Sequence, residues 1–410
     1  MQAKPTLLVL SAALVAVIFL ISGYFGYRYY SLNQTSFLDQ HWQKPMLPQG
    51  VPPAHFSELE ASLSPEACGQ CHQQQYADWQ QSLHSKTMQA GILWQLRLMP
   101  QNEANKCLDC HAPLAEQKAL VAVEQDWPNA PTAQLPGYVS ADLARQGIVC
   151  AACHVRNHKR FGPEPSTTDA QKAMGNTAHN GFVVQPEFER SEFCAGCHQF
   201  AEDSPRTAGK LRENTYQEWL ASPYSGQGVQ CQSCHMPDRR HQWQGIHYPA
   251  MVEQAVSTEL SLQNNRVIAK VTNTGAGHLF PTYMVPKIHV QLVLVSPQGE
   301  RLLTERIIGW QVSADLLTEE YDTRIAPNES LDLVFDLAEE PGAKLVEKGL
   351  ETNVELRFVV APAEHYERIF RNSLSYASQL DEATLALLTK AYRNAQRTRY
   401  SMLMNTLILN

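Results

Sequence analysis

The sequence has no long run of basic residues and no excess of positive charge. It carries 33 Lys and Arg against 41 Asp and Glu, a net charge of −8, so nucleic acid is not an expected partner. It also has no cysteine outside closely spaced pairs, because all ten cysteines fall into five Cys-x-x-Cys pairs. No cysteine therefore remains for a disulfide or for a nucleophile.

Each cysteine pair is followed directly by a histidine. We number these motifs 1 to 5 along the chain: Cys68, Cys71 and His72; Cys107, Cys110 and His111; Cys150, Cys153 and His154; Cys194, Cys197 and His198; and Cys231, Cys234 and His235. A lone pair would suit a zinc knuckle or a redox dithiol. With 15 histidines in 410 residues, five chance matches have a probability on the order of 10⁻⁷, which favours the c-type haem signature. We expect five covalent haems, with the five motif histidines as proximal iron ligands.

The amino terminus contains an uncharged apolar stretch from Pro5 to Gly23, followed by an aromatic cluster between Tyr24 and Tyr30. Its length suffices for one tilted crossing of a bilayer. Residues 1–30 are therefore predicted to be an uncleaved signal anchor, with cleavage near Ile21-Ser22-Gly23 as the alternative. Because c-type haem is attached outside the cytoplasmic membrane, the chain is expected to be a single-pass inner-membrane protein with its main domain in the periplasm.

Composition divides the rest of the chain into four segments. Residues 31–64 are rich in proline and predict a tether. Residues 65–252 carry the five motifs. Because roughly 185 residues for five haems leave little protein for an apolar core, this segment predicts a helical, loop-rich domain with the porphyrins as its core. Residues 253–370 predict a β-sandwich, and residues 371–410 a terminal helix packed on it. The expected class is thus multidomain α+β. The strand predictions rest on alternating apolar residues in 266–272, 287–295, 301–308, 329–335 and 353–360.

Ten histidines remain after the motifs are assigned. Those at His41 and His55 are expected to be exposed in the tether, and His289 and His365 to be structural. The candidates for distal iron ligands are His84, His179, His278, His247, His241 and His158. His158 follows His154 so closely that it is expected to serve a neighbouring iron, and His241 and His247 suggest a similar crossed role. His278 lies in a glycine-rich turn, where it either reaches a haem or is satisfied locally.

Two segments of the motif region echo each other. Tyr76-Ala-Asp-Trp79-Gln-Gln-Ser82-Leu-His84 and Tyr216-Gln-Glu-Trp219-Leu-Ala-Ser222-Pro-Tyr224 share their Trp and Ser spacing. Both predict a helix with an aromatic side chain facing a haem. Tyr224 stands where the first segment has His84, and so suggests a missing distal ligand.

These motifs, with Ser191-Glu-Phe before Cys194 and His241 and His247 after motif 5, resemble the multihaem cytochromes related to the tetrahaem electron acceptor of hydroxylamine oxidation. The resemblance covers residues 65–285. It implies stacked haem pairs, mostly with two histidine ligands per iron. The fifth motif, the anchor and the C-terminal extension depart from the family's namesake.

Two functions remain open from the sequence. The first is a membrane-anchored pentahaem electron carrier between a membrane donor, such as a quinol or another redox protein, and a second redox partner. The second is an oxidoreductase with one open haem acting on a small nitrogen or sulfur oxyanion, suggested by Tyr224 and the loop 161–168. A quinol dehydrogenase of the membrane-anchored tetrahaem type fits less well, because such proteins lack a β-domain.

Overall fold

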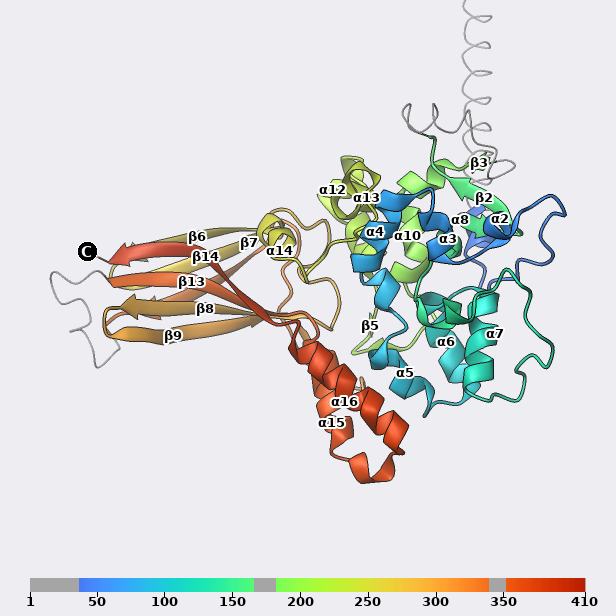
Figure 1. The fold of residues 1–410 in the computed structure, drawn as a ribbon. Coiled ribbons are helices and arrows are strands. Elements are labelled where there is room, and N and C mark those ends of the chain that lie inside the picture. Colours follow the sequence, from blue (N-terminus) through green and yellow to red (C-terminus); the bar gives the residue numbers. More distant parts are fainter. Residues whose placement is uncertain (1–36, 166–181, 339–351, 410) are drawn as a thin grey trace, which may run out of the picture.

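A computed structural model describes residues 37–165, 182–338 and 352–409. A region of short helices holds all five motifs, and an elongated β-sandwich extends from one side of it, with a helical hairpin beneath the junction (Figure 1). The predicted α+β architecture is confirmed at this level. Within the described residues no helix is both long and apolar enough to cross a bilayer, and the predicted anchor, residues 1–30, lies outside them.

The motif region consists of helices α2 (Glu58–Ala61), α3 (Pro65–Gly69), α4 (Gln73–Gln81), α5 (Ala90–Leu96), α6 (Gln101–His111), α7 (Ala115–Glu124), α8 (Cys150–His154), α10 (Ser191–His198), α11 (Thr215–Leu220), α12 (Pro223–Gly226), α13 (Cys231–His235) and α14 (Pro249–Ala255). Two small sheets lie among them, formed by β1 (Val155–Arg156), β2 (Lys159–Gly162) and β3 (Phe182–Val184), and by β4 (Arg206–Thr207) and β5 (Lys210–Leu211). Each motif begins within one of these helices. In motifs 2 to 5 the helix contains both cysteines of the pair, whereas in motif 1 helix α3 ends at Gly69 and Cys71 lies in the following turn.

The segment predicted as a tether is packed against the motif region from residue 37 onward. Met46 and Leu63 join an apolar cluster with Leu143 and Val149. His41, expected to be exposed, is 2% exposed and lies among the rings of Phe37, Trp42 and three other phenylalanines. The proline content that suggests an extended linker is equally compatible with a chain that winds over a surface without regular structure.

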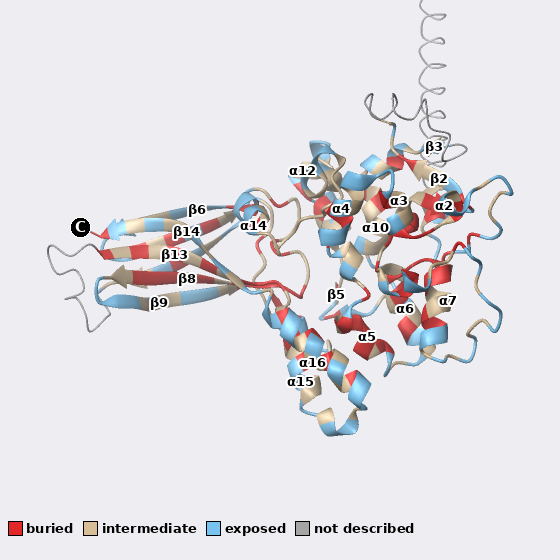
Figure 2. Cartoon of the chain, in the orientation of Figure 1, coloured by how far each residue is buried: buried red, intermediate tan, exposed pale blue. Residues whose placement is uncertain are grey.

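The β-domain is a sandwich of two antiparallel sheets, one of order β12-β7-β6 and one of order β14-β13-β8-β9. Its strands are β6 (Val256–Gln263), β7 (Arg266–Asn273), β8 (Lys287–Ser296), β9 (Gly299–Ile308), β12 (Ser330–Asp336), β13 (Thr352–Ala361) and β14 (Tyr400–Leu409), with the hairpin β10 (Trp310–Val312) and β11 (Glu319–Asp322) beside them. Buried residues are frequent on the central strands β8 and β13, whereas β9 is largely exposed or half-buried (Figure 2). All five strands expected from apolar alternation are confirmed.

The predicted terminal helix is wrong in its position. Two helices, α15 (Glu364–Leu374) and α16 (Glu382–Gln396), form a hairpin between β13 and β14, and residues 400–409 are a strand paired with β13. Helix α16 ends at Gln396, and beyond it Tyr400, Met402 and Met404 lie on one side of a strand and pack on the sandwich core. The hairpin packs against α5 of the motif region, where Arg97 bonds to Asp381 and Thr384.

The sandwich core depends on large side chains that are fully enclosed. Phe358 is 0% exposed, so Phe358→Ala is expected to lower the free energy of unfolding by about 3–5 kcal/mol. Val334→Ala on an outer face, where the side chain is 52% exposed, is expected to cost less than about 0.5 kcal/mol. Urea titrations of both variants measure the difference, and equal costs would contradict this account of the core.

Candidate haem-binding sites

The five motifs lie against one another through their cysteines. Three pairs of thiols from different motifs lie close enough to shift each other's pKa: Cys68 with Cys150, Cys110 with Cys197, and Cys194 with Cys231. In each pair the pKa of one thiol is lowered and the pKa of its partner is raised. None of the ten cysteines forms a disulfide. Motif 1 therefore adjoins motif 3, and motif 4 adjoins both motif 2 and motif 5.

Three motif histidines face a second histidine across a nearly constant gap. The ring centroids are 6.4 Å apart for His198 and His84, 6.2 Å for His154 and His241, and 6.3 Å for His235 and His278. An iron bonded to two imidazole nitrogens at about 2.0 Å from each would separate the ring centres by about 6.3 Å. The gap is therefore the width that one iron between two imidazoles requires.

Five imidazole rings are oriented by hydrogen bonds to backbone carbonyl groups of other residues. In each ring, Nδ1 lies at hydrogen-bond distance from a carbonyl oxygen. This contact assigns the proton to Nδ1 and leaves Nε2 as the ligating atom. The pairs are His111 with Thr87 (3.1 Å), His154 with Phe161 (2.8 Å), His235 with Gln244 (2.6 Å), His241 with Arg239 (2.9 Å) and His278 with Leu279 (2.8 Å). Second-shell bonds of this kind are usual at metal-bound histidines.

Burial also keeps these rings neutral, which ligation requires. It lowers the pKa of His84 to about 3, and the pKa values of His154 and His278 to about 4. All three residues are half-buried rather than fully enclosed by the protein. Paired thiols, neutral imidazoles with free Nε2 atoms and iron-wide gaps together fit c-type haem.

Other predicted ligands lie elsewhere. His158 is 2% exposed, and its Nε2 is 3.2 Å from the carbonyl of Gly50, with its ring against Tyr138 rather than a motif histidine. His247 is half-buried, and burial lowers its pKa. His179 lies outside the described residues. Among the residues that the structure describes, His111 makes no ring contact with another histidine.

The two echoing segments occupy equivalent positions. The indole Nε1 of Trp79 donates to Ile148 at 2.7 Å, and that of Trp219 donates to Val229 at 2.9 Å; each acceptor lies two residues before a motif. Helix α4 thus joins motifs 1 and 3 into a first module, and helix α11 joins motifs 4 and 5 into a second. Tyr224, at the position of His84, donates its hydroxyl to Thr274 of the β-domain at 2.6 Å.

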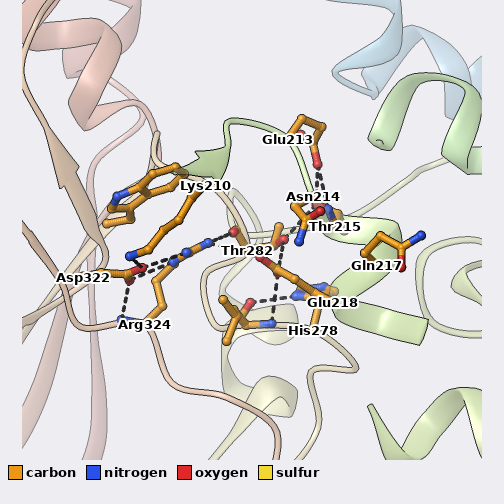
Figure 3. Close-up of polar contacts among 12 residues, drawn as sticks. Lys210, Glu213, Asn214, Thr215, Gln217, Glu218, His278, Thr282, Asp322 and Arg324 are labelled. Atoms are coloured by element: carbon orange, nitrogen blue, oxygen red, sulfur yellow. Dashed lines mark hydrogen bonds and ion pairs between the residues drawn. The ribbon is translucent and has the colours of Figure 1, made fainter. Parts of the chain in front are cut away.

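Two buried acids directly precede these tryptophans, and neither was predicted from the sequence to belong to the site. Asp78 binds Arg240 and the backbone of His241, and Glu218 binds Arg324 and the backbone of Leu279. Figure 3 shows the second of these, with Glu218 between Arg324 and the loop that carries His278. Their matching place in the two repeats was the available signal.

Comparison with known proteins agrees with this geometry. Residues 67–132 and 149–236 match the protein family described as cytochrome c554 and c-prime. The fold is similar to the crystal structure of a penta-heme cytochrome c552 from Thermochromatium tepidum, at 19% identity and a TM-score of 0.54, over 85% of this chain and 100% of that one. No curated protein sequence is significantly similar to the chain.

Gly147 constrains the segment that carries His84. Its φ of +68° lies in the left-handed region, and a Cβ there would come within 2.4 Å of the His84 carbonyl. Gly147→Ala is expected to cost on the order of 2–4 kcal/mol of unfolding free energy. Gly209→Ala is the matched control, since its φ is +79° but nothing lies within 4 Å of the added carbon. Its cost should be near 1 kcal/mol; if chemical denaturation gives the two variants the same cost, the contact with His84 is unimportant.

Proposed function

Because residues 67–132 and 149–236 match the cytochrome c554 and c-prime family, we propose that this chain is a multihaem c-type cytochrome that carries electrons on five covalently bound haems. The observation that carries the proposal is the set of three imidazole pairs at 6.2–6.4 Å. Each haem, when bound, supplies an iron that is oxidised and reduced by one electron. Two imidazoles on an iron leave no position for a substrate, which suits electron transfer.

The proposed ligands come from distant parts of the chain. His84 of the first module serves motif 4 of the second, His241 serves motif 3, and His278 of the β-domain serves motif 5. The thiol contacts and these ligands connect all five motifs without a gap, with motif 4 at the junction. The polypeptide's part in the function is to hold these motifs in contact and to keep their imidazoles neutral and oriented.

We also propose that residues 1–30 anchor the chain in the inner membrane with the haems in the periplasm. The uncharged stretch from Pro5 to Gly23 and the extracytoplasmic attachment of c-type haem support this location. A quinol or another membrane redox protein would then donate electrons, and a second redox protein would accept them.

The ligand assignment predicts different outcomes for two histidine variants. His84→Ala is expected to convert one low-spin ferric haem to high spin, because His84 lies opposite His198. His158→Ala is expected to leave every haem signal unchanged, because its ring contacts Tyr138 and Gly50. Electron paramagnetic resonance of the oxidised proteins, with haems counted by pyridine haemochrome, measures both. The assignment fails if His84→Ala changes nothing, and a count other than five refutes the stoichiometry.

A second function is favoured by the surroundings of motif 2. Within the described residues His111 has no facing imidazole. Burial raises the pKa of Tyr366, and Glu213 and Cys107 of motif 2 add smaller contributions to this shift. An iron there would keep a free position, as an oxidoreductase acting on a small nitrogen or sulfur oxyanion requires, and Tyr366 is the proton donor that we propose for it.

This second function predicts one high-spin haem in the unaltered protein. It further predicts that Tyr366→Phe slows reduction of nitrite or hydroxylamine by at least about tenfold, the usual contribution of a positioned proton donor being 10²–10⁴. Electron exchange with a small redox mediator should be unaffected by this variant. A wholly low-spin spectrum would exclude the open site and leave electron transfer as the function.

A further inference from the structure

We propose that Asp78 and Glu218 are positioning residues, each of which holds the distal histidine of the second haem in its module. The proposal rests on the ligand assignment above, in which His241 faces His154 and His278 faces His235. In each module the acid stands immediately before the repeated tryptophan. Neither acid touches a histidine ring; each holds the backbone beside one.

In the first module Asp78 is 3% exposed and accepts five hydrogen bonds, the longest of them from Gln242 at 3.5 Å. Its Oδ1 accepts from Arg240 Nη2 at 2.6 Å and from Gln74 at 3.1 Å. Its Oδ2 accepts from Arg240 Nε at 2.7 Å and from the backbone N–H of His241 at 3.0 Å. The carboxylate therefore fixes the two residues that begin the His241 segment.

In the second module Glu218 makes the corresponding contacts with the β-domain (Figure 3). Its Oε2 accepts from the backbone N–H of Leu279 at 3.2 Å and from Thr282 Oγ1 at 2.6 Å. Its Oε1 accepts from Arg324 at 3.2 Å, and the two charged side chains are only 9% and 6% exposed. Arg324 also bonds to the carbonyl of Thr282. The loop that carries His278 is thus fastened to helix α11.

Neighbouring residues of one helix thereby hold both sides of each haem site. Trp79 binds the backbone just before motif 3, whereas Asp78 binds the segment of the opposing His241. Trp219 and Glu218 do the same for motif 5 and His278. Since each acid and tryptophan are adjacent on a rigid helical turn, the distance between the two imidazoles is set by that turn.

Replacing each acid by its amide, Asp78→Asn or Glu218→Gln, tests the positioning role separately from the packing of the side chain. Every atom within hydrogen-bond distance of the Asp78 oxygens is a donor, so in Asp78→Asn the amide NH₂ must face an Arg240 N–H in either orientation. In Glu218→Gln the NH₂ faces either Arg324 or the Leu279 N–H. Each change keeps the side-chain shape but opposes two donors, so the ligand segment is released while the helix remains intact.

The test compares these isosteres with direct removal of the ligand in the full-length holoprotein. His241→Ala and His278→Ala identify the low-spin ferric signal that belongs to each iron. Asp78→Asn should weaken or shift the signal lost in His241→Ala only, and Glu218→Gln the signal lost in His278→Ala only. Carbon monoxide binding to the reduced protein should accelerate by about tenfold or more, the usual scale of a lost second-shell contact.

Controls and conservative variants separate the possible failures. Glu202→Gln and Glu300→Gln break surface pairs with Arg206 and Arg357 and should change neither readout. Glu218→Asp and Asp78→Glu keep the charge, and should shift the same signals less if an isostere does not accumulate as holoprotein. If the histidine variants leave all haems low-spin, the ligand assignment is wrong. If they create high-spin haem while all four acid variants behave like the controls, the positioning role is refuted.

Discussion

The pairing of imidazole rings across a gap of one iron is the constraint on which the rest of this structure depends. A haem edge can be held by two thiols on a single turn of helix, but its second axial ligand must come from another segment and must arrive within a few tenths of an ångström. Three such pairs draw together residues separated by 43, 87 and 114 positions of sequence. The motif region has many short helices because each must stop where a ligand or a cysteine pair is needed.

The two halves of the molecule are stabilised in different ways. The β-domain has one continuous apolar core built from both sheets, with strands such as β8 and β13 alternating inward and outward. The motif region has only small apolar clusters, such as that of Leu63 and Leu143, between its cysteine pairs. Its cohesion therefore comes largely from the prosthetic groups and from polar contacts at helix ends. The buried Glu218 to Arg324 pair joins the two kinds of structure, and a buried pair of this type is costly to break from one side.

Much of the site follows from sequence, because haem attachment is a local motif. The cysteine pairs, the helical Trp segments and the sandwich could all be predicted, and the sequence singles out His84, His241 and His278, each of which the structure places opposite a motif histidine. Which motif histidine each one faces could not be predicted, since that depends on how two modules cross. His158 lies elsewhere, because its left-handed backbone turns the ring toward Gly50 and Tyr138. The strand at residues 400–409 was missed because a helix precedes it and its apolar residues continue the helical pattern by coincidence.

His84 and Tyr224 occupy the same position in the two modules, and the difference between them explains why the series of modules stops after the second. His84 leaves its own module and reaches the next one, so it works as a coupling between repeat units. Tyr224 has the same place in the second unit but binds Thr274 of the β-domain. The sandwich accordingly occupies the side on which a third unit would attach. A cytochrome of this design is a short series of repeated modules. The series ends where Tyr224, in place of a histidine, binds the β-domain.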